Sequence, residues 1–212
     1  TEVIQRAPAL TLWLCAPGII GDSFNARLVR DLTGIRCAIS NGATPMKVQL
    51  RAPVDPFTTG ARCPLTYGLD SAVAPTVEIV DPSTVLLGVD GAGRPSLVAR
   101  RAEGATTVLS LAPRVPASVL RSLARAAGVH VYCETDDRFY ANGTMVAICG
   151  ETPGRRSIRL RKPADVFTVP DGEAVATGAT EFPAQLGAGQ AQVFAVRPAG
   201  SGAPGLGEET PD

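Results

Sequence analysis

The chain has 212 residues, of which 45% are hydrophobic, and its 20 basic residues are balanced by 20 acidic ones. This length and apolar content suit one medium domain or two small ones with a buried core. A net charge of zero provides no basic surface for a nucleic-acid backbone or an anionic membrane. The longest apolar runs are too short, or too interrupted by Pro and Gly, to span a bilayer. We therefore expect neither nucleic acid nor a membrane as a partner.

The first residues, Thr1 to Arg6, contain no Met and lack the layout of a signal peptide, so we expect a fragment whose true N-terminus lies upstream. The cysteines are odd in number, widely spaced and never in a C-x-x-C pair, and the chain has a single histidine, His130. We therefore expect neither a metal site nor a disulfide framework, and the redox compartment stays open. The five cysteines, expected as small buried side chains, are Cys15, Cys37, Cys63, Cys133 and Cys149.

The first elements follow an α/β pattern. The apolar run Leu10 to Cys15 predicts a strand buried on both faces. Asp22 or Ser23 then caps a predicted helix that ends before Gly34, a residue suited to the left-handed conformation that closes a helix. The segment from Ile35 to Ser40 is predicted to return as the next strand.

Residues 41–75 have weak periodicity and frequent Pro and Gly, so we expect a loop with at most a short strand at Val48 to Leu50. Beyond this loop, β-branched and apolar residues predict four strands, with a turn at 90–94 between the second and the third. These strands are expected at 76–80, 85–89, 95–101 and 106–111.

The clearest predicted helix begins at Pro116 and ends before Gly128, with its apolar side chains on one face. The next segment, Val129 to Tyr132, is expected to leave this helix as a strand. A strand, an amphipathic helix and a second strand suggest a parallel pairing. We therefore predict that residues 1–132 form an α/β flavodoxin-like domain that is incomplete at its N-terminus.

Beyond Glu134 the sequence contains strand signals only, separated by turns that contain glycine. These predicted strands lie at 139–149, 156–160, 164–169, 174–176 and 190–196. Short strands at such spacing predict a small antiparallel β-sandwich over 133–197. The Gly- and Pro-rich end, 198–212, is expected to be a disordered tail.

The order of these segments resembles a known family. Leu12-Trp13-Leu14-Cys15-Ala16-Pro17-Gly18, followed by Leu32-Thr33-Gly34-Ile35, is similar to part of the glutamine-amidotransferase-like, or trimerisation, domain of beta-galactosidase-like glycoside hydrolases. Further along the chain, the end of the same domain is matched by the segment Ala127-Gly128-Val129-His130-Val131-Tyr132. A small β-domain closes the chains of this family, and its first residues are similar to Asp136-Asp137-Arg138-Phe139-Tyr140-Ala141-Asn142. The resemblance covers about residues 1 to 196, with a gap at 41–75.

The resemblance implies that the α/β domain at 1–132 is of the class I glutamine-amidotransferase-like type. It also implies a non-catalytic accessory and assembly region in carbohydrate metabolism, in a bacterial enzyme. Its expected partners are an upstream catalytic barrel of the same chain and further copies in a homo-oligomer. The catalytic glutamates of the family belong to that barrel, so we expect no catalytic, cofactor-binding or metal-binding residue in this segment. Two alternatives stay open, namely a carbohydrate-binding module and a cysteine amidotransferase or hydrolase.

A cysteine enzyme would use Cys15, which follows a predicted strand, with His130 as its base. The sequence lacks the glycine-flanked elbow of such nucleophiles, and His130 lies within a predicted strand. The only carboxylate cluster, formed by Glu134, Asp136 and Asp137, is interpreted as a solvated turn between domains, where Asp137 bonds to Tyr140 or to the following loop.

The remaining motifs favour structural roles. Asn142-Gly143-Thr144 matches a glycosylation sequon, but Asn-Gly is also typical of a hairpin turn, which we prefer. The glycines at 88, 91 and 93 precede no predicted helix, so a phosphate site is not expected. A carbohydrate-binding module needs exposed aromatic rings, whereas Trp13, Phe139 and Tyr140 are expected to pack in the core.

Overall fold

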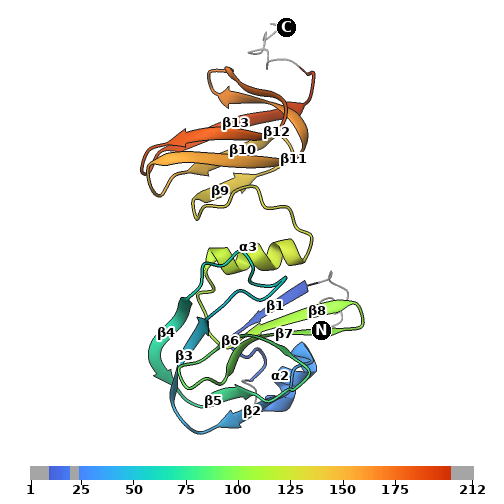
Figure 1. The fold of residues 1–212 in the computed structure, drawn as a ribbon, viewed down its shortest axis with the longest axis vertical. Coiled ribbons are helices and arrows are strands. Elements are labelled where there is room, and N and C mark those ends of the chain that lie inside the picture. Colours follow the sequence, from blue (N-terminus) through green and yellow to red (C-terminus); the bar gives the residue numbers. More distant parts are fainter. Residues whose placement is uncertain (1–9, 20–23, 202–212) are drawn as a thin grey trace, which may run out of the picture. The chain divides into compact units, whose positions relative to one another are not determined.

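The computed structural model describes residues 10–19 and 24–201. The chain divides into two compact units that meet between Val129 and His130, and Figure 1 draws both in the colours of the sequence. Compactness alone does not show that the units fold independently. The division into domains at 1–132 and 133–197 therefore stays a prediction, and each unit is described by itself.

The first unit is built on a six-stranded mixed sheet. The strand order is β1-β8-β7-β6-β3-β4, with β1 parallel to β8 and every other neighbouring pair antiparallel. The bounds of these strands are Leu10–Leu14 for β1, Ala105–Ser110 for β8, Pro95–Ala102 for β7, Val85–Val89 for β6, Thr44–Leu50 for β3 and Leu65–Val73 for β4.

Both faces of this sheet are covered, because its central strands bury alternate side chains on opposite sides. On one face Leu97, Ala99 and Val108 pack with Val119 and Leu123 of helix α3, which spans Ala117–Ala126. On the other face the central strands contribute Val98 and Leu109 to a smaller cluster. Strands β7 and β8 therefore bury side chains on both sides of the sheet.

The smaller cluster is closed by a separate two-stranded ribbon, in which β2 (Cys37–Ser40) pairs antiparallel with β5 (Thr76–Ile79). Helix α2 (Ala26–Thr33) leads into this ribbon. Its N-terminal cap is Asn25, whose side chain accepts a hydrogen bond from the N–H of Arg27, and Gly34 ends the helix with a φ of 73°. The left-handed glycine is confirmed, and the expected caps Asp22 and Ser23 lie outside the described residues.

The α/β flavodoxin-like fold predicted for residues 1–132 is wrong, and with it the amidotransferase-like type. A doubly wound fold needs helices between successive parallel strands, whereas the described residues are mostly β and hold two helices. Residues 41–75, read as a loop, form strands β3 and β4. Antiparallel hairpins therefore replace the expected helical crossovers, since the sheet neighbours come from sequence-adjacent strands.

The predicted strand after the second helix is also absent. Residues 129–132 carry no strand, so α3 does not connect two parallel strands. Pro116 caps α3 and Gly128 has a φ of 74°, which confirms the two signals that bounded this helix. The sole parallel pair among the described strands is β1 with β8, and these are far apart in the sequence.

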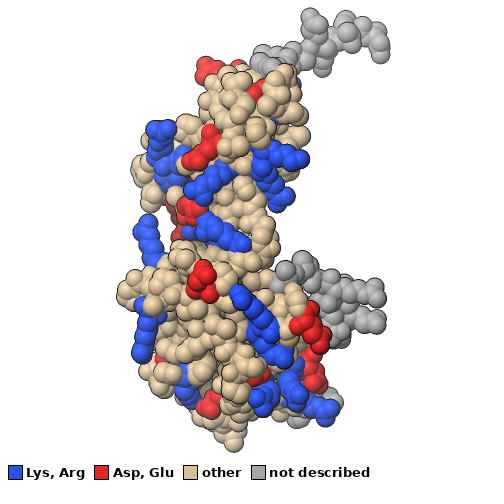
Figure 2. Space-filling view, turned by 45° about the vertical axis from the view of Figure 1, so that its right-hand side comes forward, with Lys and Arg blue, Asp and Glu red and all other residues tan. Residues whose placement is uncertain are grey.

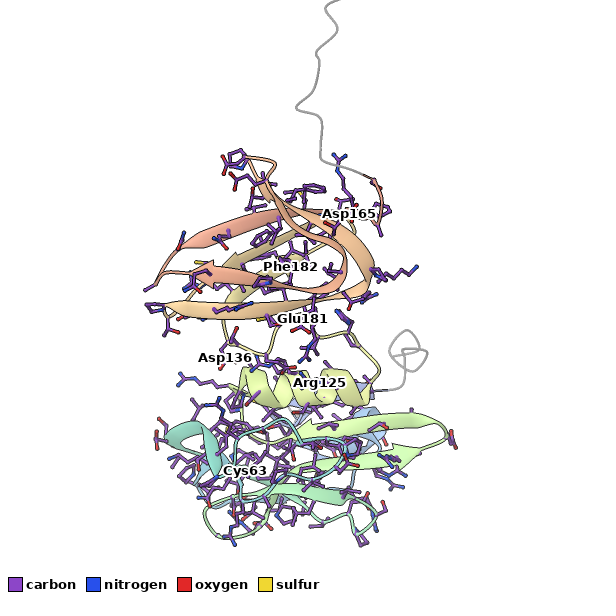
Figure 3. All side chains as sticks on the ribbon, turned by 45° about the horizontal axis from the view of Figure 1, so that its top comes forward. Cys63, Arg125, Asp136, Asp165, Glu181 and Phe182 are labelled. Atoms are coloured by element: carbon purple, nitrogen blue, oxygen red, sulfur yellow. The ribbon has the colours of Figure 1, made fainter. Side chains whose placement is uncertain are left out.

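The second unit forms one antiparallel sheet in the order β12-β11-β13-β10-β9. The bounds are Arg138–Ala141 for β9, Met145–Cys149 for β10, Gly154–Val169 for β11, Ala174–Leu186 for β12 and Ala191–Pro198 for β13. Shifts of register between Arg159 and Phe167 interrupt the β11–β12 pairing, and bulges of this kind bend strands. The sheet therefore curls around its own core, which includes Phe182, labelled in Figure 3.

The expected two-sheet sandwich is corrected to this single curled sheet. The segments 156–160 and 164–169 were expected as separate strands but belong to one strand, β11, because the chain stays extended between them. Asp165, also labelled in Figure 3, is buried at this bend and accepts hydrogen bonds from the N–H groups of Gly178 and Gly200. Of the expected tail at 198–212, residues 202–212 lie outside the described residues.

Candidate functional site

The cysteine proposed as a nucleophile directly follows strand β1. Cys15 donates its N–H to the carbonyl of Ser110, and Cys15 and Ala16 have φ values of 58° and 51°. Residues other than glycine rarely adopt this left-handed conformation. Burial raises the pKa of the Cys15 thiol, so the thiolate is disfavoured. An activated nucleophile requires the opposite shift.

The proposed base, His130, belongs to the second unit. Its Nε2–H donates to the main-chain carbonyl of Arg159 at 3.0 Å, and its ring meets the ring of Tyr132 edge to face at 4.5 Å between centroids. Nε2 is the donor in this bond. The Cys15 thiol lacks the lowered pKa that a cysteine–histidine dyad needs, and we do not pursue a cysteine enzyme.

The three carboxylates at 134–137 differ in burial, and only Asp137 is withdrawn from solvent. The Asp137 side chain is 2% exposed and pairs with Arg156, whose Nη2 also donates to the carbonyl of Thr152 at 2.7 Å. The side-chain hydrogen bond from Arg156 holds the pKa of Asp137 well below its usual range, although burial opposes this shift. Asp137 also accepts the N–H of Glu151 at 2.9 Å. The solvated turn expected for Asp137 is therefore wrong, and of the partners expected for it, Tyr140 or the N–H groups of the following loop, the structure shows a loop N–H, that of Glu151.

The other two carboxylates are exposed, and Glu134 pairs with Arg159 at 2.9 Å. Among the described residues, no group of three or more His, Cys, Asp and Glu side chains is arranged to hold a metal ion. No helix in this part of the chain is long and apolar enough to cross a membrane. Figure 2 shows basic and acidic side chains interspersed over the face that it draws.

The two turn motifs have the structural roles expected of them. Asn142 begins the β9–β10 hairpin, and its side-chain oxygen accepts the N–H groups of Thr144 and Met145 at 2.9 and 2.8 Å. Gly88 lies within β6 and Gly93 has a φ of 82°, and a strand follows them instead of a helix. A phosphate cradle needs a helix that begins directly after its glycines, and here strand β7 follows them.

Three aromatic side chains were expected to pack in the core, and one of them, Tyr140, is exposed instead. Trp13 packs against the smaller cluster of the first unit, and Phe139 packs against the core of the second. The Tyr140 side chain, in contrast, is 72% exposed on the edge strand β9. One exposed ring does not make the row of rings that stacks along a polysaccharide, so the carbohydrate-binding module of the β-domain gains no support.

The first unit contains a pocket of about 310 Å³ that the sequence did not indicate. It lies between one end of the six-stranded sheet and strand β5 of the ribbon, since the strand ends of that sheet and Thr76, Val77 and Glu78 of β5 line it. Apolar side chains, among them Phe24, Met46, Val77 and Leu111, form most of its wall. The pocket was missed because much of its lining belongs to 41–75, where we expected a loop.

The polar end of the pocket is an ion-pair cluster formed by Glu78, Asp90 and Arg94. Arg94 donates from Nη1 to Glu78 at 2.8 Å and from Nε to Asp90 at 2.8 Å. Burial of Asp90 opposes its ionisation, but hydrogen bonds from Arg94 and Ala92 outweigh burial and lower the pKa of Asp90. The i,i+4 spacing of Asp90 and Arg94 in the expected turn was the one sequence signal for this cluster.

A mixed sheet followed by a curled antiparallel sheet is a fold shared with part of several beta-galactosidases. One of them is the beta-galactosidase from Bacillus circulans sp. alkalophilus, which is 12% identical, with a TM-score of 0.55 over 89% of this chain and 29% of that chain. Another is a catalytic mutant of Gan42B, a GH42 beta-galactosidase from G. stearothermophilus, at 13% identity, TM-score 0.53, 90% of this chain and 28% of that chain.

These identities show a similarity of fold alone, and the chain spans less than a third of the length of either enzyme. No protein-family model matches the sequence, and no curated protein does. The family resemblance is thus supported at the level of the fold of a beta-galactosidase segment. The finer assignment to a particular domain of those enzymes belongs to the proposal that follows.

Proposed function

We propose that this chain is a non-catalytic accessory and assembly region of a beta-galactosidase-like glycoside hydrolase. The observation that carries the proposal is the order of the two units, because the fold matches over both in succession, across 89–90% of the chain. The matched share of the enzymes, 28–29%, leaves most of their length for other parts. A catalytic barrel upstream in the parent chain is the partner that this proposal requires.

The assembly part of the proposal is supported by apolar side chains on the surface of the first unit. Leu14 at the end of β1, Phe24 just before α2 and Leu28 within α2 are all exposed. Val85 and Leu86 of β6 are exposed as well. Large apolar side chains at the surface favour contact with other protein, because burying them removes apolar area from water.

The first test is the sequence of the complete gene product before Thr1. A (β/α) barrel with two glutamates at strand ends supports the proposal, because glycoside hydrolases use paired carboxylates. An unrelated preceding domain overturns it. The chain itself, incubated with nitrophenyl β-galactoside, is expected to release no nitrophenol. Release by the purified chain, retained after a second purification step, contradicts the non-catalytic role.

The assembly part is tested separately by sedimentation of the chain over a range of concentrations. We expect association that increases with concentration, and a Leu28→Glu variant is expected to weaken it, because a charge on an apolar contact is costly to bury. Asp31→Asn, an exposed change on the same helix, is the control. A chain that stays monomeric at the highest soluble concentration excludes assembly through this region.

A further inference from the structure

The pocket of the first unit opens at the carboxyl ends of two parallel strands. Cys15 and Ala16 follow β1, Leu111 follows β8, and all three line the pocket. Strand β8 is parallel to β1 and antiparallel to β7, so the loops that leave β1 and β8 lie at the same end of the sheet as Pro95, the start of β7, which also lines the pocket.

The backbone at the same place adopts an unfavourable conformation. Cys15 and Ala16 are consecutive, neither is glycine, and both have positive φ values, 58° and 51°. Side chains clash with the backbone in this region, and proteins retain such conformations mostly at binding sites and switches. The turn directs the chain from β1 along the pocket wall toward Ile19, which is also a lining residue.

The polar end of the pocket offers both hydrogen-bond donors and acceptors. Asp90 is occupied, because its two oxygens accept the N–H groups of Ala92 and Arg94 and the Arg94 guanidinium. It therefore fixes Arg94 in place. The Arg94 guanidinium has five N–H donors, and among the described residues its only side-chain partners are the two carboxylates of Glu78 and Asp90. Glu78 receives Arg94 on Oε1, and within the described chain no donor bonds its Oε2.

The charges at this end select against anions. Two carboxylates, Glu78 and Asp90, surround one guanidinium, so the cluster carries one net negative charge and repels anions. A cation could bind the second oxygen of Glu78, but it would offer no acceptor to the remaining N–H donors of Arg94. A neutral ligand with two hydroxyl groups can use both side chains, since one hydroxyl can donate to Glu78 while its neighbour accepts from Arg94.

We propose that this pocket binds one neutral sugar ring, with adjacent hydroxyls on Glu78 and Arg94 and its C–H face against the apolar wall. The pocket volume of about 310 Å³ is sufficient for one sugar ring. A cavity of about 150 Å³ already holds benzene, which is also a six-membered ring but has no hydroxyl groups. Phe24, whose side chain is 55% exposed, provides an aromatic surface on that wall. The inference goes beyond the accessory role, which stands even if the pocket binds no sugar.

The test is a titration of the isotope-labelled chain with methyl β-galactopyranoside, followed by amide NMR. We expect saturable shifts at pocket residues such as Cys15, Val77 and Ser96. Cyclohexanol, a ring of similar size with one hydroxyl, is the comparison ligand. It fills the same space but can engage only one of the two polar groups, so we expect it to bind more weakly than the sugar.

The variant Glu78→Gln keeps the shape of the side chain and removes its charge. We expect it to weaken sugar binding at least tenfold, or about 1.4 kcal/mol, and to weaken cyclohexanol binding less, because the single hydroxyl of cyclohexanol can bond to Arg94 instead. Phe24→Ala should weaken the binding of both methyl β-galactopyranoside and cyclohexanol, because it removes the aromatic surface of the apolar wall. Glu103→Gln, in the exposed turn between β7 and β8, is the matched control and should change neither. The amide spectrum of each variant without ligand checks that its fold is intact.

Three results would overturn the proposal. The first is equal or tighter binding of cyclohexanol, which would make the pocket merely apolar. The second is sugar-induced shifts confined to residues outside the pocket. The third is the absence of any saturable shift in the folded parent chain at the highest soluble sugar concentration. None of these results bears on the preceding barrel or on association of the chain, which test the accessory role.

Discussion

At the scale of single residues, the strongest electrostatic feature is the buried pair of Asp137 and Arg156. Their side chains are 2% and 7% exposed, and each has further hydrogen bonds that compensate for lost hydration. The sequence analysis recognised Asp137 as a structural residue but did not predict its ion pair with Arg156. Its actual partner lies on strand β11, and no local pattern connects a turn residue to a particular arginine on a distant strand.

We expect Asp137→Asn to destabilise the second unit by about 3 kcal/mol, because it leaves the Arg156 guanidinium buried without a countercharge. The pKa of Asp137 is lowered by folding, so the pair contributes its full stability above the unfolded value of about 4. This contribution is lost as the pH falls further toward the depressed folded value. Urea unfolding of parent and variant at neutral and acid pH measures both effects.

The control for this prediction is Glu151→Gln, which removes a carboxylate that pairs with Arg138 at 3.6 Å on the surface of the same unit. Its side chain is 57% exposed, and such pairs contribute less than about 1 kcal/mol. Equal losses for the two variants, or a difference from the parent that persists unchanged in acid, would refute the assigned role of Asp137.

At the scale of elements, the predicted strands 95–101 and 106–111 became β7 and β8. The β-branched and apolar run 106–111 suits a central strand, and β8 lies between β1 and β7. Strand β4 was missed, and only the Val48 to Leu50 part of β3 was predicted, because Pro45, Lys47, Gly68 and Asp70 interrupt their pattern. These strands are stabilised by their pairing with each other, and pairing is not visible in either segment alone.

The glycines of the 88–93 region allow a sharp test of this packing. A Cβ at Gly88 would lie 2.7 Å from Cγ1 of Val48 and 3.2 Å from the carbonyl oxygen of Gln49. We therefore expect Gly88→Ala to destabilise the first unit by about 1–3 kcal/mol through overpacking between β6 and β3. Thermal unfolding followed by Trp13 fluorescence measures the change.

Gly91→Ala is the matched control, because an added Cβ there meets no atom within 4 Å. It lies in the turn after β6, and its expected effect is within about 0.5 kcal/mol of the parent. If Gly88→Ala proved as harmless as Gly91→Ala, β6 would not lie against β3 as closely as the structure places it.

At the scale of the whole molecule, the predicted fold class was wrong although several elements were right. The sequence supplied a strand–helix–strand order, and the rule for such units led to a parallel sheet. In the structure β1 is parallel to β8, a strand far along the chain, and hairpins form the rest of the sheet. Strand order depends on which distant strands pair. The same strands and helices are therefore compatible with both the predicted parallel sheet and the observed mixed sheet.

The two compact units are predicted to unfold separately. The core of the second unit contains no residue of the first, and Phe182 lies in it with its ring 5.0 Å from that of Phe194. We expect Phe182→Ala to destabilise the second unit by about 3–5 kcal/mol. The sole tryptophan, Trp13, reports on the first unit, so its fluorescence midpoint in urea should not move while the far-UV circular dichroism gains an earlier transition.

Tyr140→Ala, an exposed position in the second unit, is the control and should leave both signals near those of the parent. A fall in the Trp13 midpoint of Phe182→Ala, together with the circular dichroism, would mean that the chain unfolds as one cooperative body. The domain division would then be abandoned.

The sequence by itself determined the features that depend on neighbouring residues. The left-handed glycines at 34 and 128, the hairpin at Asn142 and the bounds of helix α3 all follow from local backbone and side-chain chemistry. Only the tertiary structure decided the strand order, the partner of Asp137 and the pocket that brings Glu78 to Arg94. These depend on which distant segments pack together, because burial energy is shared among all side chains of a core rather than encoded within one segment.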